Sequence, residues 1–290
     1  ALLVVTLTWT LIRIAPGNFY DDEKKLPAAV RANIIKKYGL DKPWYQQYGI
    51  MIWNVMQGDF GDSVKYQGQS VNEIIRRHLP YSATMGFLAY VLALAIGLTA
   101  GIIAALRQNS AFDYASMSIS MLGLSLPNFV LGPILVVFFS FWLYWFPPAR
   151  WGGFSALVLP VLTLTAIYAA YIARLTRAGM LEVMRSDYIR TARAKGLSEK
   201  TVLLRHGIWG GIIPVVSFTG PALAALLAGT VVVEKVFAIP GLGNIFIQSV
   251  LNRDEPLILG IVAFISILIM LFNLIVDISY AFLDPRIRYE

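Results

Sequence analysis

Few side chains in this sequence are of the kinds that carry out covalent or metal chemistry. Among its 290 residues there are two histidines, His78 and His206, and no cysteine. The histidines lie far apart, and neither has the short spacing to a second ligand that metal sites use. The sequence contains no G-x-x-x-x-G-K-[ST] phosphate loop, no G-x-S-x-G and no H-E-x-x-H. We therefore predict no catalytic residue and no metal site in this chain, and we do not expect it to be an enzyme.

The stretch with the most distinctive polar pattern is 186–206, SDYIRTARAKGLSEKTVLLRH. Ser186 or Asp187 can cap a first helix, because a short polar side chain satisfies free N–H groups of the first turn. Gly196 falls where a helix commonly ends in a left-handed residue, and Ser198 can cap a second helix. The pattern predicts a short helix beside a hinge. Its small residues leave room for another protein, and its cations offer polar contacts: Arg190, Thr191, Ala192, Arg193, Ala194, Lys195 and Gly196.

The residues around this stretch have the composition of a membrane protein. Hydrophobic residues make up 57% of the chain and charged residues 14%, with a mean hydropathy of +0.65. Soluble domains carry about a quarter charged residues. The net charge of +7 is explained by cationic loops beside membrane spans, so we expect no nucleic acid as a partner. The fold class indicated is an all-α polytopic membrane protein.

Long uncharged runs predict where the chain crosses the membrane, because a helix needs roughly 20 apolar residues to span a bilayer. Residues 1–12 cover only about 18 Å. We interpret them as a truncated first transmembrane helix, with a signal peptide as the alternative. The uncharged run at 114–149 is too long for one straight span, so its proline-rich end is assigned to a short aromatic segment. Together with 1–12, the other predicted spans make six transmembrane helices: 81–106, 118–142, 153–173, 208–233 and 256–283.

Residues 13–77 form the one sizeable polar region, which we predict to be a small extracytoplasmic helical region. Pro27 can open a helix that Gly39 stops. Pro43 can open a second helix that Gly58 stops. We interpret the region as a helical cap packed on the spans, and a docking surface for an external protein is the alternative.

Charge predicts the orientation of the chain. Residues 174–206 carry eight Lys or Arg against three Asp or Glu, a net charge of +5, and should be cytoplasmic by the positive-inside rule. Counting spans from there places 13–77 and 234–255 outside. It places 107–113 and both termini, including the tail 285–290, in the cytoplasm.

The predicted spans lack the ionisable groups that ion-driven carriers often hold at mid-membrane. Such groups are costly in lipid and are usually functional there. Asp277 is the one ionisable residue inside a predicted span, and it falls near the cytoplasmic end. We interpret Asp277 as structural, hydrogen-bonded to a neighbouring helix end or loop. The pattern argues against proton-driven transport and leaves sodium coupling through backbone carbonyls open.

Small residues gather in the span predicted at 208–233. Small faces let helices approach closely in lipid, so helix packing is one interpretation. The other is a transport pathway shared with a second membrane subunit. The candidates for this pathway or interface are Ser217, Thr219, Gly220, Gly229 and Thr230.

The segment after that span, 233–243, reads VEKVFAIPGLG and contains a strong turn signal. Phe237 with Ile239 can return into the bilayer. A structural turn is the preferred interpretation, and a contact at the mouth of a pathway is the alternative. The residues of this candidate extracytoplasmic turn are Phe237, Pro240, Gly241 and Gly243.

Several of these segments resemble one family, the membrane subunits of bacterial ABC importers. The residues at 190–192 precede Gly196, and Pro214 follows eighteen residues after the glycine. This arrangement resembles the "EAA" loop of the dipeptide/oligopeptide/nickel branch. Arg190 stands where the broader motif has a glutamate, and GIWGG replaces a stretch that usually carries alanine, arginine and asparagine. The 233–243 segment resembles the family's ET-x-F-x-x-PGLG pattern, and GDFGDSVKY is most similar to the oligopeptide permeases.

The resemblance implies a type I ABC importer permease fold, with 78–284 as its transmembrane type-1 domain. It implies that 174–206 is the coupling loop, whose helix sits in a groove of an ATPase subunit. The implied partners are a second homologous permease, two ATPase subunits, an extracytoplasmic substrate-binding protein and the lipid membrane. ATP and Mg²⁺ would be bound by the ATPase subunits, so no cofactor is expected in this chain.

The function implied by the resemblance is ATP-driven import of peptides, most of all oligopeptides, across the bacterial inner membrane by alternating access. A dipeptide or nickel/metallophore importer of the same family is the first alternative. An ion-coupled carrier or channel is the second, and it predicts uptake that follows an ion gradient and ignores ATP. A structural membrane anchor is the third.

Overall fold

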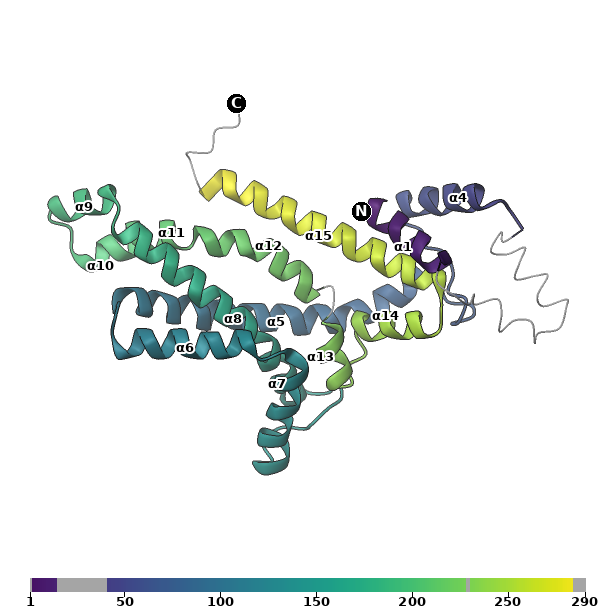
Figure 1. Cartoon of the computed structure of the whole chain (residues 1–290), viewed down its shortest axis with the longest axis horizontal. Helices are drawn as coiled ribbons and strands as arrows, with labels where there is room; N and C mark the ends of the chain where they lie inside the picture. Colours follow the sequence, from purple (N-terminus) through teal and green to yellow (C-terminus); the bar gives the residue numbers. More distant parts are fainter. Residues whose placement is uncertain (1, 15–40, 228–229, 284–290) are drawn as a thin grey trace.

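The computed structural model describes residues 2–14, 41–227 and 230–283, with side chains placed as far as Ser279. Within these ranges the regular secondary structure is helical apart from one isolated backbone bridge between Asp62 and Ser70, which confirms the predicted all-α class. Long helices lie along the long axis of the molecule, and several shorter ones lie near its two ends (Figure 1). The long helices are α5 (Val71–Leu106), α6 (Ala111–Ser125), α8 (Phe154–Met184), α12 (Ile213–Leu227) and α15 (Glu255–Leu283).

Four helical stretches of the described residues are long and apolar enough to cross a membrane: Val71–Leu106, Phe154–Met184, Ile213–Val236 and Glu255–Ser279. A fifth is present if two helices joined by a sharp bend, covering 111–142, count as one span. Helix α1 (Leu2–Ile14) is apolar but has only 13 residues, about 20 Å of helix. The protein therefore has several candidate spans, and the predicted total of six depends on α1.

The predicted span at 118–142 is not one continuous helix. Helix α6 ends at Ser125, and α7 (Asn128–Leu135) then continues as the π-helix η2 (Val136–Trp142) at an angle of 106° to α6. Pro127 explains the break, because a proline disfavours helical backbone in the residue before it. Leu126 accordingly has φ −89° and ψ 112°. The segment α7–η2 leaves the bundle crosswise (Figure 1).

Two helices extend beyond the uncharged runs that predicted them. Helix α5 begins at Val71, where the Ser70 hydroxyl accepts a hydrogen bond from the backbone N–H of Glu73. Helix α8 continues to Met184, so residues 174–184 of the predicted coupling loop are helix instead. A single charged side chain does not end a helix that has good helix formers around it.

Helices α5 and α8 make the most extensive helix–helix contact in the described structure. Glycines make this approach possible. An ideal Cβ on Gly97 would lie 2.8 Å from the carbonyl oxygen of Ala169, and one on Gly101 would lie 2.6 Å from that of Ala173. Small faces of this kind let membrane helices pack backbone against backbone. The α5–α8 pair is the scaffold on which the other elements are placed.

At one end of the molecule, α4 (Trp44–Met56) confirms the second helix predicted in the polar region. Gly58 follows it with φ 75°. The rings of Tyr48 and Trp9 meet edge to face at 5.3 Å, and α4 packs with α1 against the start of α15. Helix α4 therefore packs as a cap on other helices. The first predicted helix, at 27–38, lies outside the described residues.

Candidate functional site

The predicted helix–glycine–helix is confirmed at 186–206. Helix α9 (Asp187–Ala194) ends before Gly196, which has φ 81°, and Ser198 accepts a hydrogen bond from the backbone N–H of Thr201 at the start of α10 (Glu199–Val202). The Ser186 hydroxyl instead donates to the carbonyl oxygen of Val183, so the side-chain cap expected for α9 is not formed. Helices α9 and α10 lie at the opposite end of the molecule from α1 and α4 (Figure 1).

One predicted contact residue of this loop faces inward. Ala192 is only 5% exposed and packs with Ile189 and Val202, with Val183 of α8 beside them. We call these four residues the loop core. A helix of eight residues is too short to be stable alone, so this packing is what holds α9 in place. Ala192 therefore serves the loop's own packing, and its side chain is not available to an outside protein.

The outward face of α9 holds the remaining predicted contact residues, all exposed: Arg190, Thr191, Arg193, Ala194, Lys195 and Gly196. Arg190 pairs with Asp187 at 3.3 Å within α9. Arg193 donates two hydrogen bonds to the Glu199 carboxylate, at 2.8 and 3.2 Å, and so ties α9 to α10. These bonds hold the pKa of Glu199 below its usual range. The face is thus small, polar and cationic, which suits contact with another protein.

Glycines fix this loop to α8. The chain continues from α10 through the π-helix η3 (Leu203–Gly207) and α11 (Ile208–Gly211) into α12. An ideal Cβ on Gly211 would overlap the Met180 side chain of α8, and one on Gly210 would lie 2.8 Å from the Tyr188 hydroxyl of α9. The GIWGG sequence therefore lets α8, α9 and α11 meet at close range.

The described residues among the candidates for a pathway have different surroundings. Ser217 is exposed, whereas Thr219 is partly buried and accepts a hydrogen bond of 2.5 Å from Tyr90 of α5. Gly220 packs against α15, where an ideal Cβ would lie 3.2 Å from the carbonyl oxygen of Phe272. Thr230 is partly buried just before α13 (Val231–Val236). Gly229 lies outside the described residues. For Gly220, helix packing within the chain is the interpretation that the structure supports.

The 233–243 segment is a buried turn. Phe237 and Ile239 are each 1% exposed and belong to the main core with α5, α8 and α12, so their side chains pack against the chain's own helices. The carbonyl oxygen of Pro240 lies 2.7 Å from Nδ1 of His78. An ideal Cβ on Gly243 would lie 2.6 Å from the Cα of Val231. The turn is therefore shaped by packing against the chain's own helices.

A buried carboxylate that no sequence pattern predicted secures this turn. Glu234 is fully buried and accepts hydrogen bonds from the Ser82 hydroxyl at 2.6 Å and the Asn244 backbone N–H at 2.9 Å. Ser82 in turn accepts the Leu242 N–H at 2.8 Å. An ideal Cβ on Gly241 would lie 2.5 Å from both the Glu234 carboxyl and the Ser82 Oγ. The only signal in the sequence was a glutamate at the edge of an apolar run.

Two other buried aspartates were also missed. Asp113 is 1% exposed and accepts two hydrogen bonds from Arg177, at 2.6 and 2.7 Å, which fixes the start of α6 to α8. Asp254 accepts from the Ser63 hydroxyl and from the backbone N–H of Val64 and of Lys65. It thereby joins the GDFGDSVKY segment to the start of α15. Asp277, by contrast, is exposed on α15.

The fold and these features define a helical protein with several candidate membrane spans and an exposed cationic helix at one end. Residues 97–289 match the family model of the binding-protein-dependent transport system inner membrane component. The chain belongs to that family.

Relatives match over nearly the whole chain. The oligopeptide transport system permease protein OppB of Haemophilus influenzae is 45% identical over 99% of this chain and 94% of its own length. OppB of Escherichia coli strain K12 is 42% identical over the same shares. The dipeptide transport system permease protein DppB of Bacillus subtilis is 41% identical over 99% of this chain and 93% of its own.

A solved structure has a fold similar to that of this chain. A chain of the inward-facing MetNI methionine ABC transporter aligns with a TM-score of 0.62, covering 73% of this chain and 96% of that chain. Its sequence identity is 18%, so the likeness concerns the fold alone.

Proposed function

We propose that this chain is the transmembrane permease subunit of an ATP-driven importer that carries peptides across the bacterial inner membrane by alternating access. The observation that carries the proposal is the match to peptide permeases over 99% of the chain, at 41–45% identity. Oligopeptides are the preferred substrate class, because the OppB relatives of H. influenzae and E. coli are somewhat more similar than DppB of B. subtilis. Dipeptides are the alternative.

The topology we propose has six spans. Helix α1 is the first, the bent segment 111–142 is the third, and the end that carries α9 faces the cytoplasm. The net charge of +5 at 174–206 supports this orientation, since short cationic loops stay inside. Both chain termini are then cytoplasmic. Helix α4 lies on the outer side, where it is available to an extracytoplasmic substrate-binding protein.

The outward face of α9 is the proposed contact to an ATPase subunit. ATP and Mg²⁺ would be bound by two such subunits, and a second homologous permease would complete the pathway. The close glycine contacts among α8, α9 and α11 support a mechanical role. A movement of α9 imposed by the ATPase would reach α8 and α12 through these contacts.

Disulfide cross-linking tests this proposal. The chain has no cysteine, so an introduced cysteine is its only thiol. One cysteine replaces Ala194, which is exposed on the outward face, and another replaces Gln67, which is exposed at the opposite end. Ala194 is preferred over Ala192, because Ala192 is buried in the loop core. Each variant is combined with single cysteines in the ATPase subunit encoded with this chain.

We expect cross-links from position 194 that change with ATP, and none from position 67. Cross-links from position 67 and none from position 194 would mean that the chain has the opposite orientation in the membrane. No cross-link from 194, together with uptake that follows an ion gradient and ignores ATP, would replace the importer with an ion-coupled carrier.

A further inference from the structure

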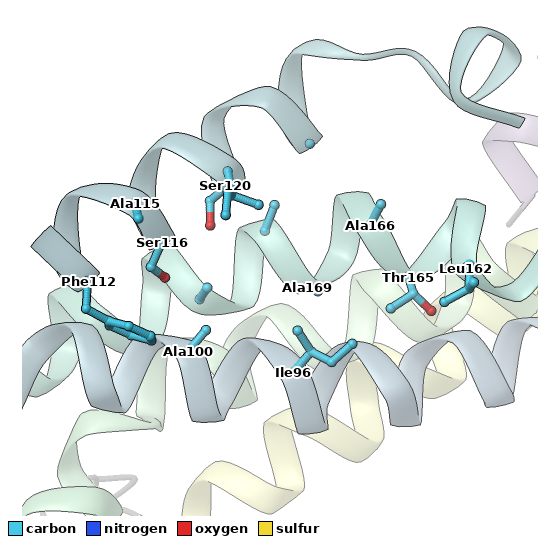
Figure 2. Close-up of a pocket in the computed structure, with 14 residues that line it drawn as sticks. Ile96, Ala100, Phe112, Ala115, Ser116, Ser120, Leu162, Thr165, Ala166 and Ala169 are labelled. Atoms are coloured by element: carbon cyan, nitrogen blue, oxygen red, sulfur yellow. The ribbon is translucent and has the colours of Figure 1, made fainter. Parts of the chain in front are cut away.

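A groove of about 440 Å³ lies between α5, α6 and α8. Its walls are apolar and its floor is made of small residues, with Ala170 and Ala173 of α8 almost fully buried. Figure 2 shows Ser116 and Ser120 of α6 on one side, facing Ala169 of α8 and Ile96 of α5. Alanine and serine side chains set the space between the helices.

The rim of this groove is exposed on the outside of the helix bundle. Ile119 is 69% exposed, Ile96 47% and Phe112 42%. In a protein that crosses a bilayer, such an apolar opening faces lipid tails or another membrane helix. A helix has a diameter of about 10 Å, whereas a single acyl chain is thinner and more flexible. The positive charge at one end of the groove, described next, favours the acyl chain of a lipid.

The groove leads to a cationic end at the α5–α6 turn. Phe112 and Ala115, both in its lining, lie in the first turns of α6. Arg107 caps the C-terminus of α5, next to Gln108, and Arg185 donates a hydrogen bond of 3.1 Å to the Gln108 side chain.

Arg177 of α8 also reaches this turn, through its ion pair with Asp113. Asp113 in turn accepts a hydrogen bond of 3.0 Å from the Asn109 backbone N–H. Three guanidinium groups thus surround the turn against one buried carboxylate, and the local charge is positive. An apolar groove that ends in an excess of positive charge matches an anionic phospholipid.

We propose that this groove binds one acyl chain of an anionic phospholipid, with the lipid phosphate held at Arg107. Basic pockets between helices on the cytoplasmic side of a membrane favour such headgroups. The placement in the cytoplasmic leaflet rests on the topology proposed above, whereas the groove and its cationic end do not. The bound lipid would fill the space between α6 and the α5–α8 scaffold and so support the position of α6.

Photolabelling tests this site in the assembled transporter, reconstituted in phosphatidylcholine bilayers. Trace phosphatidylglycerol with a diazirine in its acyl chain is present in both leaflets, so the outcome does not depend on orientation. A second sample contains the same diazirine chain on phosphatidylcholine. Labelled residues are mapped by peptide mass spectrometry. We expect labelling within 112–123 and 162–173, with the phosphatidylglycerol probe at least fivefold more efficient.

Matched variants separate the two parts of the site. Ala166→Phe fills the groove and should abolish this labelling, whereas Ala95→Phe, on an exposed position of α5 outside the groove, should not change it. Arg107→Gln should lower the preference for phosphatidylglycerol about fivefold, since one cation near the surface has an effect of that order. Arg76→Gln, exposed at the other end of the same helix, should leave the preference unchanged.

Equal labelling by the two probes would overturn the proposal, and so would labelling that survives Ala166→Phe. A further experiment places a diazirine amino acid at a groove position. If it couples to a second permease, the groove is a protein interface instead. Because transport is not measured, these results are independent of the cross-linking test, and either proposal can fail alone.

Discussion

The turn at 233–243 and the loop at 186–206 are both short connections between helices, yet they are held in opposite ways. The turn is secured by a fully buried carboxylate, Glu234, and by glycines in contact with backbone and buried side chains. The loop is secured by a small apolar core and by ion pairs on its surface, such as Arg193 with Glu199. A polar network in a dry environment is costly to disturb, whereas surface ion pairs contribute little.

This difference separates a part of the molecule that is fixed by its own chain from a part that is shaped to meet another. The turn joins α5, α13 and α14 (Leu242–Leu251), and its residues Glu234 and Phe237 are buried. The loop turns its polar residues outward and is fixed through α8. Substitutions in the turn should therefore act on stability, and substitutions on the loop's outward face should act on coupling.

Glu234→Ala should have the largest effect on stability. It leaves the Ser82 hydroxyl and the Asn244 N–H without their acceptor, and each unsatisfied buried donor costs about 1–3 kcal/mol. We expect a much lower unfolding midpoint in detergent and little protein in the membrane. Glu234→Gln keeps one acceptor oxygen and should be milder. Glu73→Ala, on an exposed position of α5, is the control. An equal fall in its unfolding midpoint would contradict the claim that the buried network, and not any carboxylate, stabilises the protein.

Gly241→Ala tests the same turn through packing. Its Cβ would lie 2.5 Å from the Glu234 carboxyl and the Ser82 Oγ, and overpacking of this kind costs about 1–3 kcal/mol. Gly49→Ala is the matched control, because nothing lies within 4 Å of its Cβ and it sits inside α4. There alanine should stabilise the helix by roughly 0.5–1 kcal/mol. Thermal unfolding of the two variants should thus shift in opposite directions, and the same direction would count against the packing argument.

Much of the fold was predictable because it follows from local patterns. Apolar runs located α5, α8, α12 and α15, and Gly196 with Ser198 located the break and the restart around α9. The bend at Pro127 was harder, because a proline fixes local backbone and leaves the angle to the packing of the helices around it. The predicted helix ends were also wrong. A charged residue ends an apolar run without ending the helix, and α8 continues past its first charged residues.

The candidate site divides in a similar way. The helix–glycine–helix and its cations could be predicted because they are neighbours in the sequence. The inward direction of Ala192 depends on Val183 and Val202, which only the folded loop brings beside it. The partners Glu234–Ser82 and Asp113–Arg177 are far apart in sequence, and no local pattern links them. A single sequence shows which residues are polar, whereas tertiary packing decides which of them meet.

Ala192→Glu and Ala194→Glu sharpen the comparison inside the loop. At position 192 the new carboxylate would be buried in the loop core without a partner, so α9 should detach. We expect rapid proteolysis near Arg190 together with loss of uptake. Ala194→Glu places the same charge on the exposed outward face and should leave proteolysis unchanged. If α9 is the proposed ATPase contact, a transporter assembled with this variant still hydrolyses ATP but takes up less peptide. Faster proteolysis from Ala194→Glu would mean that the outward face also belongs to the loop's own packing.

Glu199→Gln should have the smallest effect, because the bond it weakens lies at the surface. The measurement is the rate of proteolysis of the loop, and we expect a change of less than about twofold. The sign of its pH dependence follows from the pKa of Glu199, which the hydrogen bonds from Arg193 hold below its usual range. The contribution of a carboxylate with a lowered pKa is present above its unfolded pKa and is lost as pH falls through its folded pKa.

Wild-type protein and Glu199→Gln should therefore differ at neutral pH and converge in acid. A large difference at neutral pH would mean that the surface pair, and not the loop core, holds α9 in place. The contrast with the turn would then rest on burial alone, since both connections would depend on a single carboxylate.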